Sequence, residues 1–395
     1  MPTSLKVSLA KSYTGRFVAW LLWFNFIDLL ACVWQQPSMR KAKKRVILQR
    51  IDGIGDYIVW TSTFRALEAL YPSADYERIF VGCDVVRPLA ENQPFFDRTI
   101  LINQGLFVFD PKYRFQIIRQ VRRLRADVLI NFKLTREFLW SDSVVRCSGA
   151  PIRIGSAGLN NQMSSLSQKI GDGWYTQLIK APVRYEHELI SHKKFITAMA
   201  PRFDFELMIP GIPESQIDPA SVIDGDYAIF FLGAAQANKI WPMEKFVEVA
   251  NFVEKTCNLR VVLCGGRNEQ GLADEFKASY SGSVIDLMGN DLLELNRLIR
   301  SAKLVLSNDT GAGHIAAVLK TPTVIITPGN QVDRFFPYPS LPVTDGIRQL
   351  SVVHEMPCFG CGYHCIYKDR PEDSPMPCVE GVSVADVTSA ISELI

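Results

Sequence analysis

The chain lacks a strong charge of either sign. Its 395 residues carry 43 lysines and arginines against 41 aspartates and glutamates, a net charge of +2. Proteins dedicated to nucleic acid usually carry a basic excess that neutralises phosphates, so this balance argues against such a partner. A complete G-x-G-x-x-G fingerprint is also missing, which argues against a nicotinamide-dependent dehydrogenase.

A glycine-rich segment follows a short apolar run late in the chain. Residues 303–307 are typical of a buried strand, and residues 315–319 of an apolar helix. The turn between them contains Asp309, Thr310, Gly311, Gly313 and His314. A strand–turn–helix presents backbone N–H groups and a positive helix end, which suits a phosphate, while Asp309 and His314 add an acceptor and a titratable donor. Alternatively, Asp309 only caps the helix and the glycines only shape the turn.

A second glycine-rich turn, with Gly53, Gly55 and Asp56, lies near the N-terminus. It follows a strand-like run at residues 45–51 and opens a helix-like stretch at residues 57–71. Glycines at such a place let a substrate approach the backbone closely. Asp56 would repel a phosphate, but a carboxylate at the mouth of a cleft can accept a proton from an attacking sugar hydroxyl. The alternative is an aspartate that only caps its helix.

These segments resemble glycosyltransferase family 9, the heptosyltransferases of lipopolysaccharide core synthesis. In chain order, the similar stretches are residues 45–72, 231–246, 261–269, 287–289, 292–302 and 308–311. The resemblance is strong over residues 227–330, good over residues 45–75 and weak between residues 90 and 220. An ordered series of this kind rarely arises by accident.

Apolar runs alternate with helix-like stretches, as in parallel α/β sheets. The first set of runs lies at residues 46–51, 78–82, 99–102, 127–132 and 152–155. The second lies at residues 227–233, 259–265, 283–288, 303–307 and 323–327. We therefore expect the α/β GT-B fold, with two Rossmann-like doubly wound domains facing a cleft. Residues 45–218 would form the acceptor-side domain and residues 219–395 the nucleotide-sugar donor domain, because the chain exceeds the size of one core.

An apolar segment, residues 17–34, lies in an N-terminal extension, residues 1–44, that known family members mostly lack. It is rich in Trp and Phe, and Asn25 and Asp28 interrupt it on one helical face. It could lie in a membrane interface, span the membrane or dock on the protein body. Its aromatic residues and basic flanks favour the first, and no clear signal-peptide cleavage site follows. We expect residues 17–45 to bind a membrane surface, which would make this cytoplasmic enzyme peripheral on the inner membrane.

Basic residues cluster in the half of the chain expected to meet the acceptor. One run covers residues 40–45. A second group lies on a helix predicted to begin at Asp110–Pro111, and its members are Lys112, Arg114, Arg119, Arg122, Arg123 and Arg125. A basic run is most often a solvated face, and an anionic lipid surface is the alternative that the location favours.

The resemblance implies an inverting transfer that needs no metal ion or other cofactor. Asp56 would take the proton from an acceptor hydroxyl, and Lys239 would neutralise the departing diphosphate. Glu269 would hold the ribose. The donor sugar and phosphates would be bound by Asp309, Thr310, Gly311, Gly313 and His314. No D-x-D element has a convincing context for a metal-held diphosphate. The default donor is ADP-heptose, and the default acceptor is a lipopolysaccharide core or a related anionic glycolipid.

Two other functions fit the same motifs. One is a noncatalytic scaffold that binds a nucleotide sugar, although the presence of both Asp56 and Lys239 argues against it. The other is a GT-B enzyme that uses a different nucleotide sugar, such as a nucleotide-sugar epimerase. Base selectivity depends on a few pocket contacts that the sequence does not identify.

Four of the nine cysteines cluster near the C-terminus, namely Cys358, Cys361, Cys365 and Cys378. Their spacing is compatible with a structural zinc site, and less well with a [4Fe–4S] cluster. The loop is also proline-rich and could simply be irregular, which is the favoured interpretation. The other five cysteines are scattered and are typical of small buried hydrophobic residues.

Overall fold

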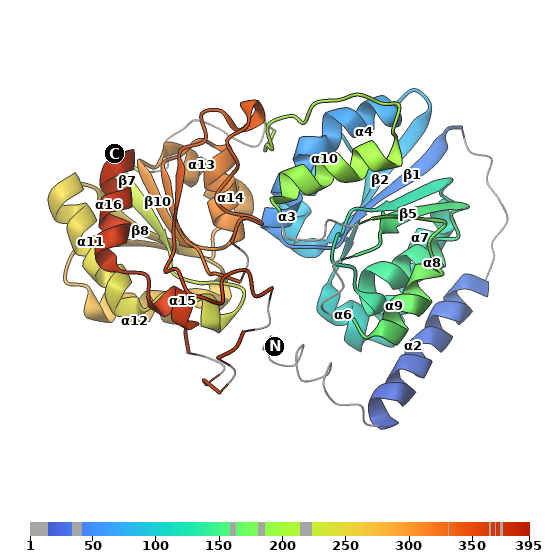
Figure 1. The fold of residues 1–395 in the computed structure, drawn as a ribbon, viewed down its shortest axis with the longest axis horizontal. Helices are drawn as coiled ribbons and strands as arrows, with labels where there is room; N and C mark the ends of the chain where they lie inside the picture. The colour runs from blue at the N-terminus through green and yellow to red at the C-terminus, as the bar shows by residue number, and fades with distance from the viewer. Residues whose placement is uncertain are drawn as a thin grey trace. The chain divides into compact units, whose positions relative to one another are not determined.

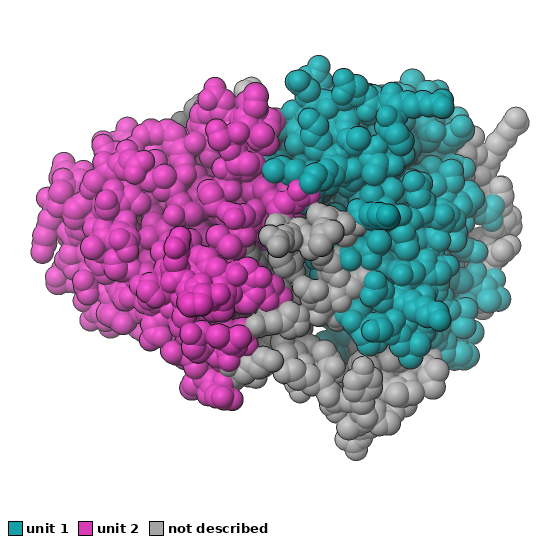
Figure 2. Space-filling model, in the orientation of Figure 1, with its two compact units in different colours: residues 1–184, 189–208 teal, residues 185–188, 209–395 magenta. Residues whose placement is uncertain are grey.

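The protein consists of two compact units in the computed structural model. Unit 1 comprises residues 1–184 and 189–208, and unit 2 comprises residues 185–188 and 209–395 (Figure 2). The structure describes residues 15–33, 42–158, 163–180, 186–213, 223–330, 332–362, 365–367, 369–371 and 374–395, with side chains from residue 23 onward. The predicted domain boundary near residue 218 lies outside these residues and stays a prediction.

Unit 1 is built on a parallel sheet of six strands in the order β3-β2-β1-β4-β5-β6 (Figure 1). The strands are β1 (Lys44–Arg50), β2 (Tyr76–Cys83), β3 (Arg98–Ile102), β4 (Val128–Asn131), β5 (Ile152–Ser156) and β6 (Gln177–Ile179). The central strand β1 is buried from Val46 to Arg50, as expected for a sheet covered on both faces. The five predicted strands are confirmed. The sixth, β6, was not predicted because three residues are too few to show a periodic pattern.

Helices cover this sheet (Figure 1). They are α2 (Gly15–Val33), α3 (Ile54–Trp60), α4 (Phe64–Leu70), α5 (Arg87–Glu91), α6 (Gln104–Phe109), α7 (Pro111–Leu124), α8 (Ser143–Ser148), α9 (Ser165–Asp172) and α10 (Glu188–Met199), with short turns η1 (Thr61–Thr63), η2 (Asp84–Val86) and η3 (Phe138–Asp142). The helix predicted over residues 57–71 is interrupted at η1, where the hydroxyl of Thr61 donates to the carbonyl of Ile58 (2.6 Å). Asp110 caps α7, as its sequence predicted.

Unit 2 repeats the same topology in a second parallel sheet, ordered β12-β11-β10-β7-β8-β9. Its strands are β7 (Tyr227–Phe231), β8 (Arg260–Gly265), β9 (Val284–Met288), β10 (Leu304–Asn308), β11 (Thr323–Ile326) and β12 (Gln349–Val352). Its helices and turns are η5 (Ala237–Lys239), α11 (Met243–Cys257), η6 (Arg267–Glu269), α12 (Gln270–Ser279), α13 (Leu292–Ser301), α14 (Gly311–Val318), η7 (Pro342–Thr344), α15 (Pro377–Glu380) and α16 (Val384–Leu394). The half-exposed β12 was not predicted.

The N-terminal helix α2 packs on α7 and α8 of unit 1. Asp28 accepts from Arg114 through both carboxylate oxygens, at 2.6 and 2.7 Å, and both side chains are buried. The guanidinium of Arg114 also lies 5.0 Å from the ring of Phe24, and Asn25 accepts from Arg146. Asn25 and Asp28 do share one helical face, and that face contacts the body. In the described part of the chain, no helix is long and apolar enough to cross a membrane.

Breaking the Asp28–Arg114 ion pair tests whether α2 is fixed on unit 1. Replacing Asp28 with Leu leaves the Arg114 charge buried without its carboxylate, so we expect the free energy of unfolding to fall by about 3–5 kcal/mol in urea titrations. Glu91→Ala is the matched control, because it breaks the exposed Arg87–Glu91 pair and should cost under about 1 kcal/mol. Equal losses in the two variants would contradict a fixed α2.

Candidate functional site

The predicted site residues gather at one point of each sheet. In both units the strand order reverses between the first and fourth strands, which are β1 and β4 in unit 1 and β7 and β10 in unit 2. Ligands of doubly wound sheets bind beyond the carboxyl ends of the strands at such a reversal. Asp56 follows β1, Lys239 follows β7 and Asp309 follows β10. Each unit therefore carries its own group of predicted site residues, which we call the half-site of that unit.

In unit 1, Asp56 lies in the first turn of α3. The N-cap of this helix is Gly53, and no side chain caps it, so the interpretation of Asp56 as a capping residue is wrong. The Asp56 side chain is 22% exposed, and its Oδ1 accepts from Nη2 of Arg50 at 3.1 Å. The next four residues of α3, Tyr57 to Trp60, are all buried, which fixes the helix that carries Asp56.

Arg50 was not predicted as a site residue, yet it is the anchor of this half-site. Its side chain is only 1% exposed, and it ends the central strand β1. Nη1 donates to the carbonyl of Phe132 (3.4 Å) and contacts Nε2 of His192. These contacts hold the guanidinium in place beside Asp56. An arginine at the end of an apolar strand-like run is the sequence signal that could have identified it.

Lys133, just beyond β4, completes an ion cluster with Arg50, Asp52, Asp56 and Glu137. Its ammonium donates to Oδ1 of Asp52 (2.7 Å) and lies 3.1 Å from Oε2 of Glu137. Burial alone would lower the pKa of Lys133, but the carboxylates of Asp52, Glu137 and Asp56 raise it above its ordinary value. The lysine therefore stays charged, and the cluster sets two cations against three carboxylates.

The glycines of this turn do not need their special freedom. Gly53 has a φ of −74°, and a Cβ built there would lie 3.6 Å from Oδ2 of Asp56, an ordinary contact. Gly55 lies within α3. Both glycines lie at the start of α3 beside Asp56, and their role in letting a substrate approach stays a prediction.

In unit 2, Lys239 and Asp309 form an ion pair. Nζ of Lys239 donates to Oδ2 of Asp309 at 3.1 Å, and the two side chains are 9% and 8% exposed. The N-cap of α14 is Thr310, whose hydroxyl shares a hydrogen bond with Ser307 (2.9 Å). Asp309 is therefore not the cap of α14, and that alternative is wrong. The structure instead joins two residues that the sequence placed 70 positions apart.

Asn308 was also missed, and it fixes the loop that carries Lys239. This fully buried residue ends β10. Its Nδ2 donates to the carbonyls of Leu232 (2.9 Å) and Gly233 (3.1 Å), and its Oδ1 accepts from the backbone N–H of Trp241 (3.1 Å). The side chain thus ties β7 and its loop to β10. Its amide, at the end of a buried apolar strand, could have identified it.

His314 lies in the first turns of α14 and is buried. Its Nδ1 shares a hydrogen bond with the hydroxyl of Tyr338 (2.9 Å), and its ring stacks on Phe336 with centroids 4.2 Å apart. Burial lowers the pKa of His314 to about 3, although Asp309 acts in the opposite direction. The imidazole is therefore neutral near pH 7. It can donate or accept a hydrogen bond there, but it does not titrate in that range.

Glu269 and Gly313 have clear local contacts. Glu269 accepts from the backbone N–H of Gly266 (2.8 Å), and its carboxylate fills the space that a Cβ of Gly233 or Gly265 would need. Burial raises its pKa. Glu269 therefore lies over the ends of β7 and β8. A Cβ at Gly313 would lie 2.5 Å from Cδ1 of Ile325, so this glycine lets α14 pack closely on β11, and its contact with a donor stays a prediction.

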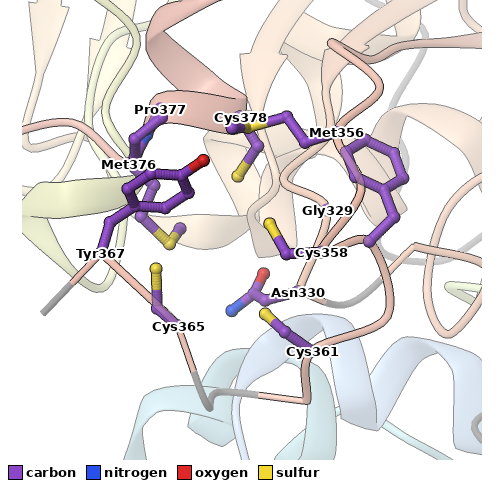
Figure 3. A pocket seen from close by; sticks show the side chains of 11 residues that line it. Gly329, Asn330, Met356, Cys358, Cys361, Cys365, Tyr367, Met376, Pro377 and Cys378 are labelled. Atoms are coloured by element: carbon purple, nitrogen blue, oxygen red, sulfur yellow. The ribbon is translucent and has the colours of Figure 1, made fainter.

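The four clustered cysteines line one pocket of unit 2 (Figure 3). Their thiols point into the same space, beside Met376 and Tyr367. Burial raises the pKa of the Cys378 thiol. Among the described residues, no three His, Cys, Asp or Glu side chains are arranged to hold a metal ion, and residues 363, 364 and 368 of this loop lie outside them. The sequence favoured an irregular loop here, and the alternative of a structural metal stays untested.

Known proteins resemble the chain in sequence. Residues 114–362 match the family described as glycosyltransferase family 9 (heptosyltransferase). Lipopolysaccharide heptosyltransferase 3 of Escherichia coli (strain K12) is 24% identical over 281 residues, which cover 68% of this chain and 78% of that protein. Lipopolysaccharide core heptosyltransferase OpsX of Haemophilus influenzae is 30% identical over 111 residues, which cover 27% of this chain and 32% of that protein.

Solved structures share the fold. A glycosyltransferase family 9 protein from Veillonella parvula superposes with a TM-score of 0.66 and 17% identity, over 90% of this chain and 98% of that chain. The E. coli heptosyltransferase WaaC with ADP-2-deoxy-2-fluoro heptose superposes with a TM-score of 0.63 and 15% sequence identity. The match covers 88% of this chain and 99% of that chain. The two doubly wound units therefore form the expected GT-B fold. Because the family match spans well over half of the sequence, the chain belongs to glycosyltransferase family 9, the heptosyltransferase family.

Proposed function

We propose that the chain is an inverting glycosyltransferase that transfers heptose from ADP-heptose to an anionic glycolipid of the lipopolysaccharide core type. We further propose that it works in the cytoplasm, at the inner membrane. One observation carries the proposal: each sheet reversal holds charged groups that the reaction can use, Asp56 beside Arg50 in unit 1 and Lys239 beside Asp309 in unit 2. The complexes of WaaC with ADP and with a fluorinated ADP-heptose support the choice of donor.

Unit 2 would bind the donor. Lys239 is nearly buried, so its charge is weakly screened and stabilises the negative charge that develops on departing ADP. Asn308 keeps the loop of Lys239 in place. Glu269, over the ends of β7 and β8, would accept hydrogen bonds from the ribose. Neutral His314 would donate to or accept from the donor sugar, and Thr310 and Gly311 would face the phosphates from the start of α14.

Unit 1 would bind the acceptor and activate it. The acceptor oxygen attacks the anomeric carbon, the bond from that carbon to ADP breaks, and its electron pair leaves with ADP. Asp56 takes the proton of the attacking hydroxyl. Arg50 holds the Asp56 carboxylate in place through the 3.1 Å contact, and is itself fixed by Phe132 and His192. This sequence of steps needs no metal ion or cofactor.

The donor is tested first by thermal unfolding with ADP-, UDP-, GDP- and CDP-sugars. A ligand that binds only the folded state raises the free energy of unfolding by about 2.7 kcal/mol at a hundredfold excess over its Kd. ADP-heptose should therefore raise the Tm, and the other nucleotide sugars should not. Lys239→Met should abolish most of that rise, because it removes the cation that faces the diphosphate. Lys255→Met, on the exposed side of α11, is the matched control and should behave like the unaltered chain. A selective response to another nucleotide sugar would discard ADP-heptose.

The general base is tested with Asp56→Asn. This change keeps the shape of the side chain but removes its basicity, so kcat should fall about 10²–10⁴-fold while the Kd of ADP-heptose stays the same. ADP release and calorimetry measure the two quantities. Asp110→Asn is the control, since asparagine also caps a helix. Full turnover by Asp56→Asn would rule out this base. Donor binding by the unaltered chain with no transfer to any core acceptor would favour a scaffold.

The protonation state of His314 gives a test with pH. Since its pKa lies at about 3, fewer than about one molecule in ten carries a charged imidazole at pH 5. The affinity for ADP-heptose should therefore vary less than about twofold between pH 5 and 8 through this residue. His314→Gln should bind the donor more weakly but with the same pH dependence. A charged His314 would instead strengthen diphosphate binding as the pH falls below 6.5, and only in the chain that keeps this histidine.

A further inference from the structure

One face of α2 is apolar and exposed although the helix is docked. Phe24, Ile27, Asp28 and Ala31 are buried against unit 1. The other side exposes Trp23, Phe26, Leu29, Leu30 and Val33, each between 47% and 77%. The buried and exposed sets each recur at helical spacing, so they occupy two sides of α2. A contiguous apolar stripe of this kind on a folded protein marks an interaction surface. We call these five exposed residues the outer face of α2.

The exposed charges of the N-terminal segment and of the helix that α2 packs on are mostly basic. Asp28 is the only acidic residue among the first 51, and the Arg114 ion pair buries and neutralises it. Among the described residues of the same segment, Lys43 and Lys44 are exposed. On α7, the helix under α2, Lys112 and Arg123 are exposed. An apolar stripe with basic residues around it complements a surface that is hydrocarbon inside and anionic at its headgroups.

We propose that the outer face of α2 is the surface on which unit 1 docks to an anionic lipid bilayer. Trp23 and Phe26, whose rings stack at 6.0 Å, enter the headgroup region together with Leu29, Leu30 and Val33. The exposed basic residues of the neighbouring helix α7, Lys112 and Arg123, contact the lipid phosphates. This inference rests on the proposed function, because it specifies how an enzyme with a glycolipid acceptor binds the membrane that contains this acceptor.

The docked arrangement links this surface to the acceptor half-site. Arg114, which holds Asp28 of α2, also donates to the carbonyl of Phe107 in α6 (3.3 Å). At the start of α6, Nε2 of Gln104 donates to the carbonyl of Ile51 (3.5 Å), immediately before the turn that leads to Asp56. Helix α2 is thus a fixed part of unit 1, connected through α7 and α6 to the turn that leads to the proposed base. It is not a separate, flexibly linked membrane anchor.

The test is flotation of the full chain with vesicles of phosphatidylcholine, with or without phosphatidylglycerol. The unaltered chain should bind the anionic vesicles more tightly, and added salt should weaken that binding. The triple variant Phe26→Ser, Leu29→Ser and Leu30→Ser should bind at least about tenfold more weakly, because it removes apolar area from the interface. A triple variant that replaces exposed apolar residues elsewhere, Met208→Ser, Ile366→Ser and Ile395→Ser, is the matched control and should bind normally.

Three results would overturn the inference. The first is equal vesicle binding by the unaltered chain and the outer-face variant, which is the triple variant Phe26→Ser, Leu29→Ser and Leu30→Ser, or no binding by either. The second is a dimer of the unaltered chain, measured by light scattering, that the outer-face variant converts to monomers. The third is vesicle binding that appears only after residues 1–14 are removed. The ADP-heptose Tm shift of the outer-face variant should equal that of the unaltered chain. This shift shows that the variant is folded, and it separates a failure of the docking surface from a failure of the proposed donor.

Discussion

Compensation of buried charge organises both half-sites and the N-terminal helix. Arg50 and Lys133 lie at the ends of buried strands, where a cation is stable only beside carboxylates and carbonyls. The same requirement pairs Lys239 with Asp309 in unit 2. Because each cation is held by groups on neighbouring strands, the loops that carry the site residues have little freedom. The charges are therefore in place before any substrate arrives, which limits the reorganisation that a reaction would need.

The two units use the same topology for different chemistry. Each sheet reverses its strand order between its first and fourth strands, so both present the same loops at the same edge. In unit 1 two cations face three carboxylates, and Asp56 is the proposed base, whereas in unit 2 the proposed catalytic group is Lys239, paired with Asp309. This division agrees with an acceptor that must lose a proton and a donor that must release an anion. Backbone topology fixes where the groups lie, and a few side chains at the strand ends decide what each edge can do.

In the N-terminal helix, a single residue, Asp28, decides how an apolar segment packs. As a sequence, residues 17–34 fit a membrane interface, a membrane span or a docked helix. Asp28 would be costly in a lipid-facing position, but it is favourable against Arg114, which offers two hydrogen bonds. The docked arrangement buries one side of α2 and leaves its other side apolar and exposed. Docking on the body and binding to a membrane are thus compatible, since they use different sides of α2.

The sequence by itself determined the alternation of strands and helices, the GT-B fold, the family and the positions of Asp56, Lys239 and Asp309 shortly after strands. These features depend on local patterns, which a chain displays along its length. Tertiary structure alone decided the partners: Arg50 beside Asp56, Lys239 beside Asp309, Asn308 across two strands, and the neutral state of His314. Those outcomes depend on burial and on contacts between residues far apart in sequence. No local pattern encodes them, because the energy of a charge or a hydrogen bond is set by what surrounds it in space.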